Sequence, residues 1–199
     1  MHFTNVFVSI ALVGTVLAVD HSVKVGGNNK ELTFTPNNIN ATKGDTVTFH
    51  FWPSNHSVAQ STFAKPCEPM SGGFWSGYIA SSSGGAMETF MYTVEDETKP
   101  VWFYCTQGQH CISGMAGAIN APATGNTVDK FISSAKAASS VVIPSSVAGT
   151  GGMLMNGTMT ASSSASGSTA SSTGAASTLE LNKNVAFTGL LGMFAYLMM

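Results

Sequence analysis

The chain contains no arginine and little charge of either sign. Charged residues make up 9% of its 199 positions, and the formal net charge is −2. Proteins that bind nucleic acid need clustered lysine and arginine to neutralise phosphates, so this class is excluded. Cysteine is scarce as well, since the chain has three. An odd number leaves at least one thiol outside any internal disulfide, and that thiol needs an explanation.

The amino-terminal apolar run predicts a secretory signal peptide over residues 1–18. Its apolar stretch from Val6 to Leu17 is too short to span a bilayer, and Val16 and Ala18 satisfy the small-residue rule for cleavage. We therefore expect the mature chain to begin at residue 19. Such a chain is extracellular, where disulfides persist.

The carboxyl-terminal apolar run predicts a signal for a glycosylphosphatidylinositol (GPI) anchor over residues 177–199. Small residues at 174–176 precede a polar spacer at 177–184, and an apolar tail of 15 residues runs to the last position. The alternative is a tail-anchored transmembrane helix, which needs about 20 apolar residues. We expect attachment at Gly174, with Ser172 as the alternative. The protein would then be held by lipid on the outer leaflet of the plasma membrane, or in the cell wall.

Two regions of different composition lie between these signals. Residues 19–122 are rich in aromatic residues and contain short alternating apolar runs, such as "DTVTFHFWP" at 45–53, separated by Gly, Pro and Asn. Short strands at this spacing predict a single all-β domain, an antiparallel sandwich or barrel. Ser, Thr, Ala and Gly dominate residues 123–176. That composition predicts a disordered, O-glycosylated stalk with room for one short helix at 127–138.

The stretch "FYCTQGQHCISGM" at 103–115 concentrates the side chains that can bind a metal. Cys105, His110 and Met115 are spaced five residues apart after the end of a predicted strand, so one tight loop can turn all three toward a common point. Thiolate, imidazole and thioether suit copper, and two histidines, one cysteine and a weak axial methionine make a blue-copper site. The local set lacks only the second histidine.

Three histidines of the domain are candidates for that second ligand. His21 lies near the expected mature terminus and reads as a surface residue. The alternation of the strand at 45–51 turns His50 away from the core. His56 follows Pro53, where the chain leaves that strand and a loop residue can face the cysteine loop. We therefore favour His56 over His50.

The segments "NHSV" at 55–58 and "YCTQGQHCISGM" at 104–115 resemble the cupredoxins, especially the phytocyanin-like branch, in which a second cysteine directly follows the downstream histidine ligand. With the terminal signals and the stalk, the chain resembles fungal GPI-anchored cupredoxins over residues 19–122. The resemblance implies a Greek-key β-sandwich that binds copper (Cu²⁺/Cu⁺). The implied ligands are His56, Cys105, His110 and Met115.

The same resemblance implies a disulfide between Cys67 and Cys111, which leaves Cys105 as the free thiolate. It also places the backbone N–H of Ser57 near the Cys105 sulfur. A site whose positions are all taken by protein implies an electron carrier and not an enzyme. An oxygenase built on an N-terminal histidine would need cleavage after Asp20, which breaks the small-residue rule.

Other functions remain open at this point. The same ligands could capture copper outside the cell, the domain could be a copper-free module of the cell wall, or the cluster could be buried without metal. The partner, a redox protein or a copper donor or acceptor, is unidentified.

We expect N-glycosylation at Asn40 and Asn156, but not at Asn55, because a glycan there would crowd His56. Thioethers at Met153, Met155 and Met159 could capture Cu(I) or be incidental to a flexible stalk.

Overall fold

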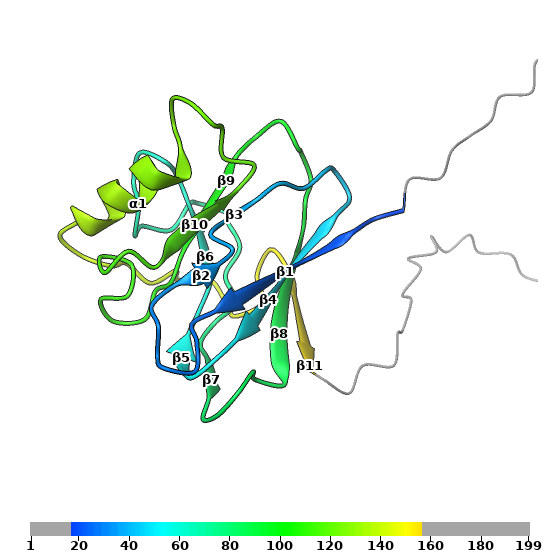
Figure 1. Cartoon of the computed structure of the whole chain (residues 1–199), viewed down its shortest axis with the longest axis vertical. Coiled ribbons are helices and arrows are strands. Elements are labelled where there is room, and N and C mark those ends of the chain that lie inside the picture. The colour runs from blue at the N-terminus through cyan, green and yellow to red at the C-terminus, as the bar shows by residue number, and fades with distance from the viewer. Residues whose placement is uncertain (1–16, 157–199) are drawn as a thin grey trace, which may run out of the picture. The chain divides into compact units, whose positions relative to one another are not determined.

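The computed structural model describes residues 17–156, and most of its strands belong to two packed β-sheets (Figure 1). The predicted signal peptide, except for its last two residues, lies outside this range. So do the GPI signal, its candidate attachment residues Gly174 and Ser172, and the distal part of the stalk. Within residues 17–156 no helix has both the length and the apolar character needed to cross a bilayer.

The larger sheet has five strands in the order β11-β8-β4-β1-β2. Its central strand β4 alternates as the sequence predicts, with Val47, Phe49 and Phe51 fully buried and His50 on the opposite face. These buried side chains form one wall of the main core. The strands are β1 Asp20–Val25, β2 Phe34–Thr35, β4 Thr46–Phe51, β8 Glu88–Thr93 and β11 Met153–Asn156.

The smaller sheet has four strands in the order β3-β10-β9-β6. Its strand β9 is buried on both faces: Phe103 packs into the core between the sheets, and Trp102 packs into a second core under the helix. Gly117 of β10 admits the Phe103 ring, because a Cβ there would lie 2.6 Å from it. The strands are β3 Asn38–Ile39, β6 Ala59–Ser61, β9 Val101–Tyr104 and β10 Ala116–Ile119.

The predicted all-β sandwich is confirmed, but its sheets are mixed and not purely antiparallel. β1 runs parallel to β4, and β3 runs parallel to β10. Neither pair is consecutive in the sequence, so crossover connections join them in place of hairpins. A separate antiparallel pair consists of β5 Ser54–His56 and β7 Ile79–Ser81. This pair lies at the end of the sandwich where the candidate site is found.

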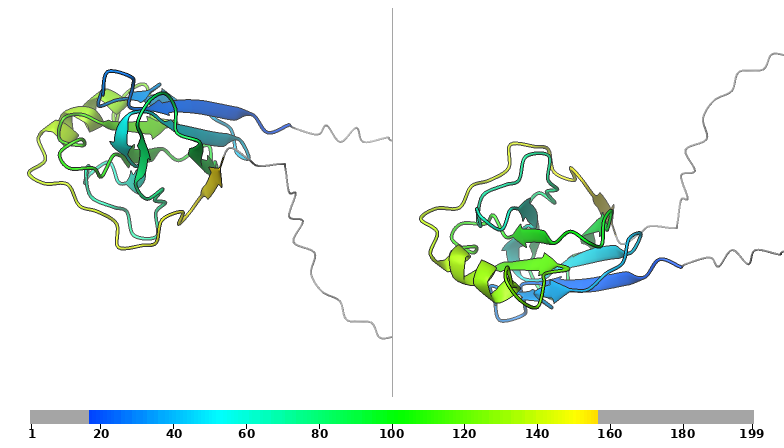
Figure 2. Two further views of the ribbon diagram at one scale, coloured as in Figure 1. Left: turned by 90° about the horizontal axis from the view of Figure 1, so that it is seen from below. Right: turned by 90° about the horizontal axis from the view of Figure 1, so that it is seen from above.

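Residues 123–156 pack against the sandwich, whereas the sequence suggested that a stalk begins at residue 123. The predicted short helix is present as α1, Val128–Lys136, which begins after the N-cap Thr127. α1 buries Phe131 against Trp102, with ring centroids 4.8 Å apart. The chain then crosses to the far end of the molecule, where β11 pairs with β8 (Figure 2). Leu154 of β11 packs against the main core, whereas Val142, Ile143 and Val147 on the way to it are exposed.

Candidate metal centre

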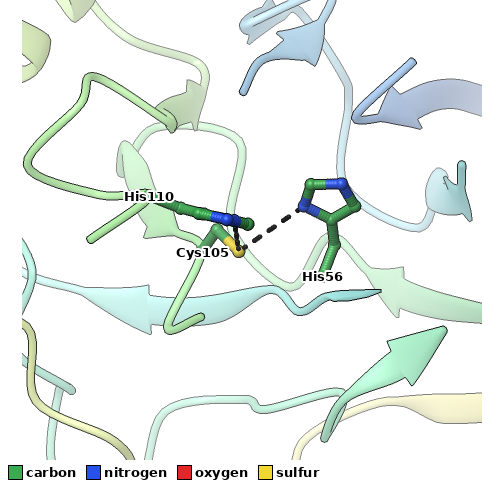
Figure 3. A group of neighbouring side chains, drawn as sticks. All are labelled: His56, Cys105 and His110. Atoms are coloured by element: carbon green, nitrogen blue, oxygen red, sulfur yellow. Dashed lines mark hydrogen bonds between the residues drawn. The ribbon is translucent and has the colours of Figure 1, made fainter. Parts of the chain in front are cut away.

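Three predicted ligands, from two parts of the chain, meet in one cluster. The Cys105 sulfur lies 3.4 Å from Nδ1 of His110 and 4.0 Å from Nδ1 of His56 (Figure 3). One donor atom from each residue lies within 4.8 Å of the others. His56 ends β5, whereas Cys105 and His110 lie in the loop after β9. The packing of β5 against this loop therefore creates the cluster.

The edge of the His56 imidazole that faces away from Cys105 is held in place by neighbouring residues. Its Nε2 lies 3.4 Å from the carbonyl oxygen of Pro53, to which it donates, and this leaves the Nδ1 lone pair facing the sulfur. Gly26 has a φ of +78°, and a Cβ on it would lie 2.5 Å from Nε2. Because the ring is fully buried, its pKa is lowered, and it is neutral and able to bind a metal at neutral pH.

The Cys105 thiol is fully buried, and its surroundings act on it in opposite directions. Burial raises its pKa, whereas backbone N–H groups of Gln107 and Ser57 and the Ser57 hydroxyl act to lower it. Ser57 Oγ lies 3.9 Å from the sulfur and accepts a hydrogen bond from the Thr106 N–H at 2.9 Å. The thiolate thus has donors in place, but a cation must offset its burial.

Backbone hydrogen bonds close the ligand loop on itself. The Cys105 N–H donates to the Met115 carbonyl at 3.1 Å, and the Met115 N–H donates to the His110 carbonyl at 2.9 Å. Met115 is fully buried in the same core cluster as Cys105. His110 is only partly buried, and this burial lowers its pKa. The loop therefore fixes the spacing of the three residues that the sequence singled out.

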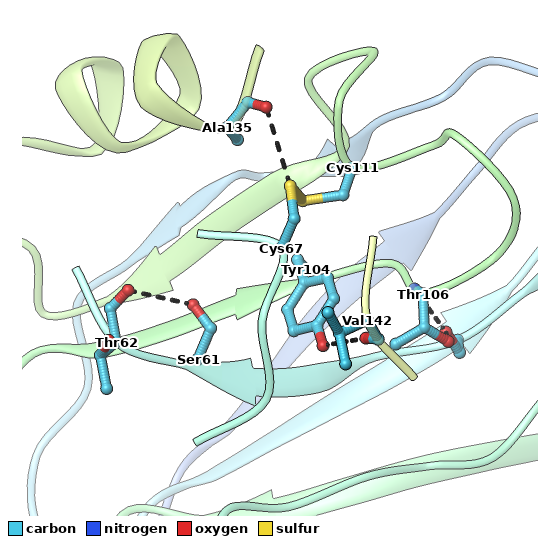
Figure 4. Close-up of a disulfide and its surroundings, with 9 residues drawn as sticks. Ser61, Thr62, Cys67, Tyr104, Thr106, Cys111, Ala135 and Val142 are labelled. Carbon is cyan, nitrogen blue, oxygen red and sulfur yellow. Dashed lines mark hydrogen bonds between the residues drawn. A yellow bond between two sulfur atoms is a disulfide. The ribbon is translucent and has the colours of Figure 1, made fainter. Parts of the chain in front are cut away.

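A disulfide joins Cys67 and Cys111, as the resemblance implied (Figure 4). Cys111 directly follows His110, and both cysteines are fully buried. The Cys67 sulfur lies 3.7 Å from the carbonyl oxygen of Ala135 in α1. The bridge therefore ties the ligand loop both to the segment around residue 67 and to the helix.

The remaining histidines of the described residues lie outside the centre. His21 pairs with Asp45 at 3.1 Å, and His50 is on the outer face of the larger sheet.

Among the predicted N-glycosylation sites, Asn40 and Asn156 are exposed. Asn55 is half-buried, and its amide nitrogen donates to Gln107 at 3.3 Å. This hydrogen bond is consistent with the prediction that Asn55 carries no glycan.

The donor set fits copper. Two imidazole nitrogens and one sulfur converge, and the buried thioether of Met115 lies in the same core cluster as Cys105. These are the soft and borderline ligands of blue-copper sites.

The sequence did not reveal the two residues that hold the ring of His56, Gly26 and Pro53. The only signal for Gly26 was the pair of glycines that follows β1.

No protein-family model matches this chain. The chain is 34% identical over 143 residues to the probable GPI-anchored cupredoxin-1 of Arthroderma benhamiae, an alignment that covers 72% of this chain and 73% of that protein. It is 35% identical over 133 residues to an extracellular serine-rich protein of the same organism, covering 66% of this chain and 51% of that protein. Oxidised plastocyanin from Dryopteris crassirhizoma is similar over 49% of this chain and 96% of its own, with 20% identity and a TM-score of 0.38.

Proposed function

Because this chain belongs to the cupredoxin family, and because it brings two imidazoles and a thiol together in one cluster, we propose that it is a type 1 copper protein that transfers single electrons. The observation that carries the proposal is the approach of Nδ1 of His56 and of His110 to the Cys105 sulfur. These three residues are the proposed strong ligands, and Met115 is the proposed weak axial ligand. Copper bound there supplies one-electron chemistry, because it alternates between Cu(II) and Cu(I).

The protein's contribution is to hold the ligands still. Pro53 fixes the ring of His56 and Gly26 leaves room for it, while the disulfide at Cys111 restrains the loop that bears His110. Ligands that do not move between oxidation states lower the barrier to electron transfer. Rigid support of this kind is therefore what an electron carrier requires.

His110 is the proposed exit for the electron. Its side chain is partly exposed, whereas His56, Cys105 and Met115 are fully buried. A redox partner that docks over the ligand loop would touch this ring first. The partner is unidentified, and the proposal requires no nucleic acid and no membrane contact other than through a lipid anchor.

The proposed setting is the outer surface of the cell. Two observations support it: the predicted signal peptide and GPI signal, and the printed names of the relatives, one GPI-anchored and one extracellular. With four protein donors, the proposed site keeps no open position for a substrate, so we assign it electron transfer and not an enzymatic reaction.

Extracellular copper capture is the second candidate, and the deep burial of Cys105 favours it because a buried metal is slow to leave. Electron self-exchange between the Cu(I) and Cu(II) forms, measured by NMR line broadening together with the reduction potential, separates the two. Rapid exchange supports electron transfer. Slow exchange with very tight retention of Cu(I) supports capture, and protein that retains no copper would make the domain a structural module of the wall.

A further inference from the structure

The methionines predicted to lie in the stalk form the edge strand of the larger sheet. β11 pairs with β8 so that Met153 is opposite Met91 and Met155 is opposite Thr89 (Figure 1). Leu154, between them, lies opposite the buried Phe90 and packs on the core. Because side chains alternate along a strand, Met153 and Met155 share the outer face with Met91. Three methionines, of which Met153 is exposed and Met91 and Met155 are partly buried, therefore gather on one patch, which we call the methionine face.

The position of β11 is set by a turn that only glycine can make. Gly151 has a φ of +70°, and a Cβ on it would lie 2.8 Å from Cα of Phe74. A Cβ on Gly152 would lie 2.3 Å from the Phe90 ring and 2.6 Å from the Met91 carbonyl oxygen. Both glycines are thus required for the chain to approach β8 this closely. Met153 is held opposite Met91 by this turn and does not hang from a loose segment.

The methionine face has the geometry and access of a binding site. Residues directly opposite on antiparallel strands have Cβ atoms about 4.5–5.5 Å apart, and diagonal pairs about 7–8 Å, which long side chains can span. Met91 is directly opposite Met153 and diagonal to Met155. Half of Met153 is exposed. A shallow hollow beside this pair also has Glu95 in its lining, whose negative charge favours a cation.

The chemistry of the methionine face selects one kind of cation. Thioethers are neutral, soft donors that prefer Cu(I) over harder ions. We propose that Met91, Met153 and Met155 form a second site that binds Cu(I) at the surface of the domain. This site lies on the outer face of the larger sheet, whereas the ligands of the buried centre come from β5 and the loop after β9. It does not depend on the function proposed for that centre.

The test counts Cu(I) ions bound by the full mature protein. Cu(I) is titrated anaerobically in competition with a chromophoric Cu(I) chelator. We expect two Cu(I) per wild-type chain, one for a Met91→Leu/Met153→Leu variant, and one for Cys105→Ser, which lacks the thiolate of the buried centre. Equal stoichiometry in the wild type and the double methionine variant would overturn the methionine site. Loss of all binding in Cys105→Ser would overturn it as well, whereas one retained ion there supports it.

Leucine is a suitable replacement because it nearly conserves the volume of methionine and lacks its sulfur. Met87 supplies the control, since it is 75% exposed, lies just before β8 and lines a different hollow from Met91 and Met153. Met87→Leu should bind as many Cu(I) ions as the wild type. Ag(I), which has the same preference for thioethers and no redox chemistry here, gives a second readout. It should shift the methyl NMR signals of Met91, Met153 and Met155 and leave that of Met87 in place; a shift of Met87 alone would contradict the assignment.

Discussion

The imidazole of His56 presents Nδ1 to the Cys105 sulfur at 4.0 Å, while the opposite edge of the ring is fixed. That edge lies 3.4 Å from the carbonyl oxygen of Pro53 and faces Gly26. The orientation of this ligand is therefore set by the protein fold and does not wait for a metal. A site organised in this way binds its metal without first rearranging, and the ligand geometry changes little when the metal changes charge.

Replacing Gly26 with alanine should weaken copper binding. A Cβ at this position would lie 2.5 Å from Nε2 of His56, so the ring must turn or shift. We expect copper affinity to fall by about tenfold or more, which corresponds to at least ~1.4 kcal/mol. Affinity is measured by competition with a copper chelator.

Gly125 is the matched control, because its φ of +76° nearly equals the +78° of Gly26 and nothing lies within 4 Å of its Cβ position. Alanine costs roughly 1–2 kcal/mol at a left-handed position in either variant. Gly125→Ala should keep wild-type copper affinity. Equal losses of affinity in the two variants would show that His56 is not oriented by Gly26.

Removing the disulfide should destabilise the domain and loosen the ligand loop. Cys67 and Cys111 are 44 positions apart, and closing a loop of that length is worth about 4 kcal/mol in the chain-entropy account. We expect a Cys67→Ala/Cys111→Ala variant to lose about 2–4 kcal/mol of unfolding free energy. Urea unfolding of the copper-free protein measures it. An unchanged midpoint would contradict the role assigned to the bridge.

The helix α1 should contribute to the stability of the sandwich. Phe131 is fully buried and packs on Trp102, so Phe131→Ala should cost about 3–5 kcal/mol of unfolding free energy. Lys130 is exposed on the same helix, and Lys130→Ala should have little effect. Equal stability of the two variants would mean that residues after 122 are dispensable, as the stalk prediction assumed.

Acid should destabilise the domain through Asp45. The backbone nitrogen of Val19 (the terminal amino group after the expected cleavage), the N–H of Thr42 and the ring of His21 donate to this carboxylate and hold its pKa well below the ordinary value. Its contribution is therefore complete above the unfolded-state pKa of about 3.9 and is lost as pH falls below it toward the folded-state pKa. Asp45→Asn should lower stability at neutral pH and flatten the loss below about pH 4. Parallel pH profiles for the variant and the wild type would refute this role.

The sequence predicted those parts of the molecule that depend on local pattern. Strand β4 was evident from its alternation, and Cys105, His110 and Met115 from their spacing within one loop. Strand β10 was missed because its residues, Ala116–Ile119, are mostly small and have low strand propensity. The close fit of Gly26 to His56 joins residues 30 positions apart, and periodicity carries no information on such a contact.

The extent of the domain was also beyond local pattern. Ser and Gly make up seven of residues 139–156, which begin the Ser-rich region that predicted a stalk. They are nevertheless fixed by a few long-range contacts: the Tyr104 hydroxyl donates to the Val142 carbonyl at 2.6 Å, and Leu154 lies opposite Phe90. A few long-range contacts of this kind do not change the composition of a segment, so they could not be predicted from the sequence.

Visible absorption of the protein loaded with Cu(II) tests whether Cys105 binds copper as a thiolate. A thiolate bound to Cu(II) gives an intense charge-transfer band. We expect this band in the wild type and in His50→Gln, because His50 lies on the outer face of the larger sheet, and we expect its loss in Cys105→Ser. Wild-type protein that binds Cu(II) without the band, or a band that survives in Cys105→Ser, would show that Cys105 is not the copper ligand.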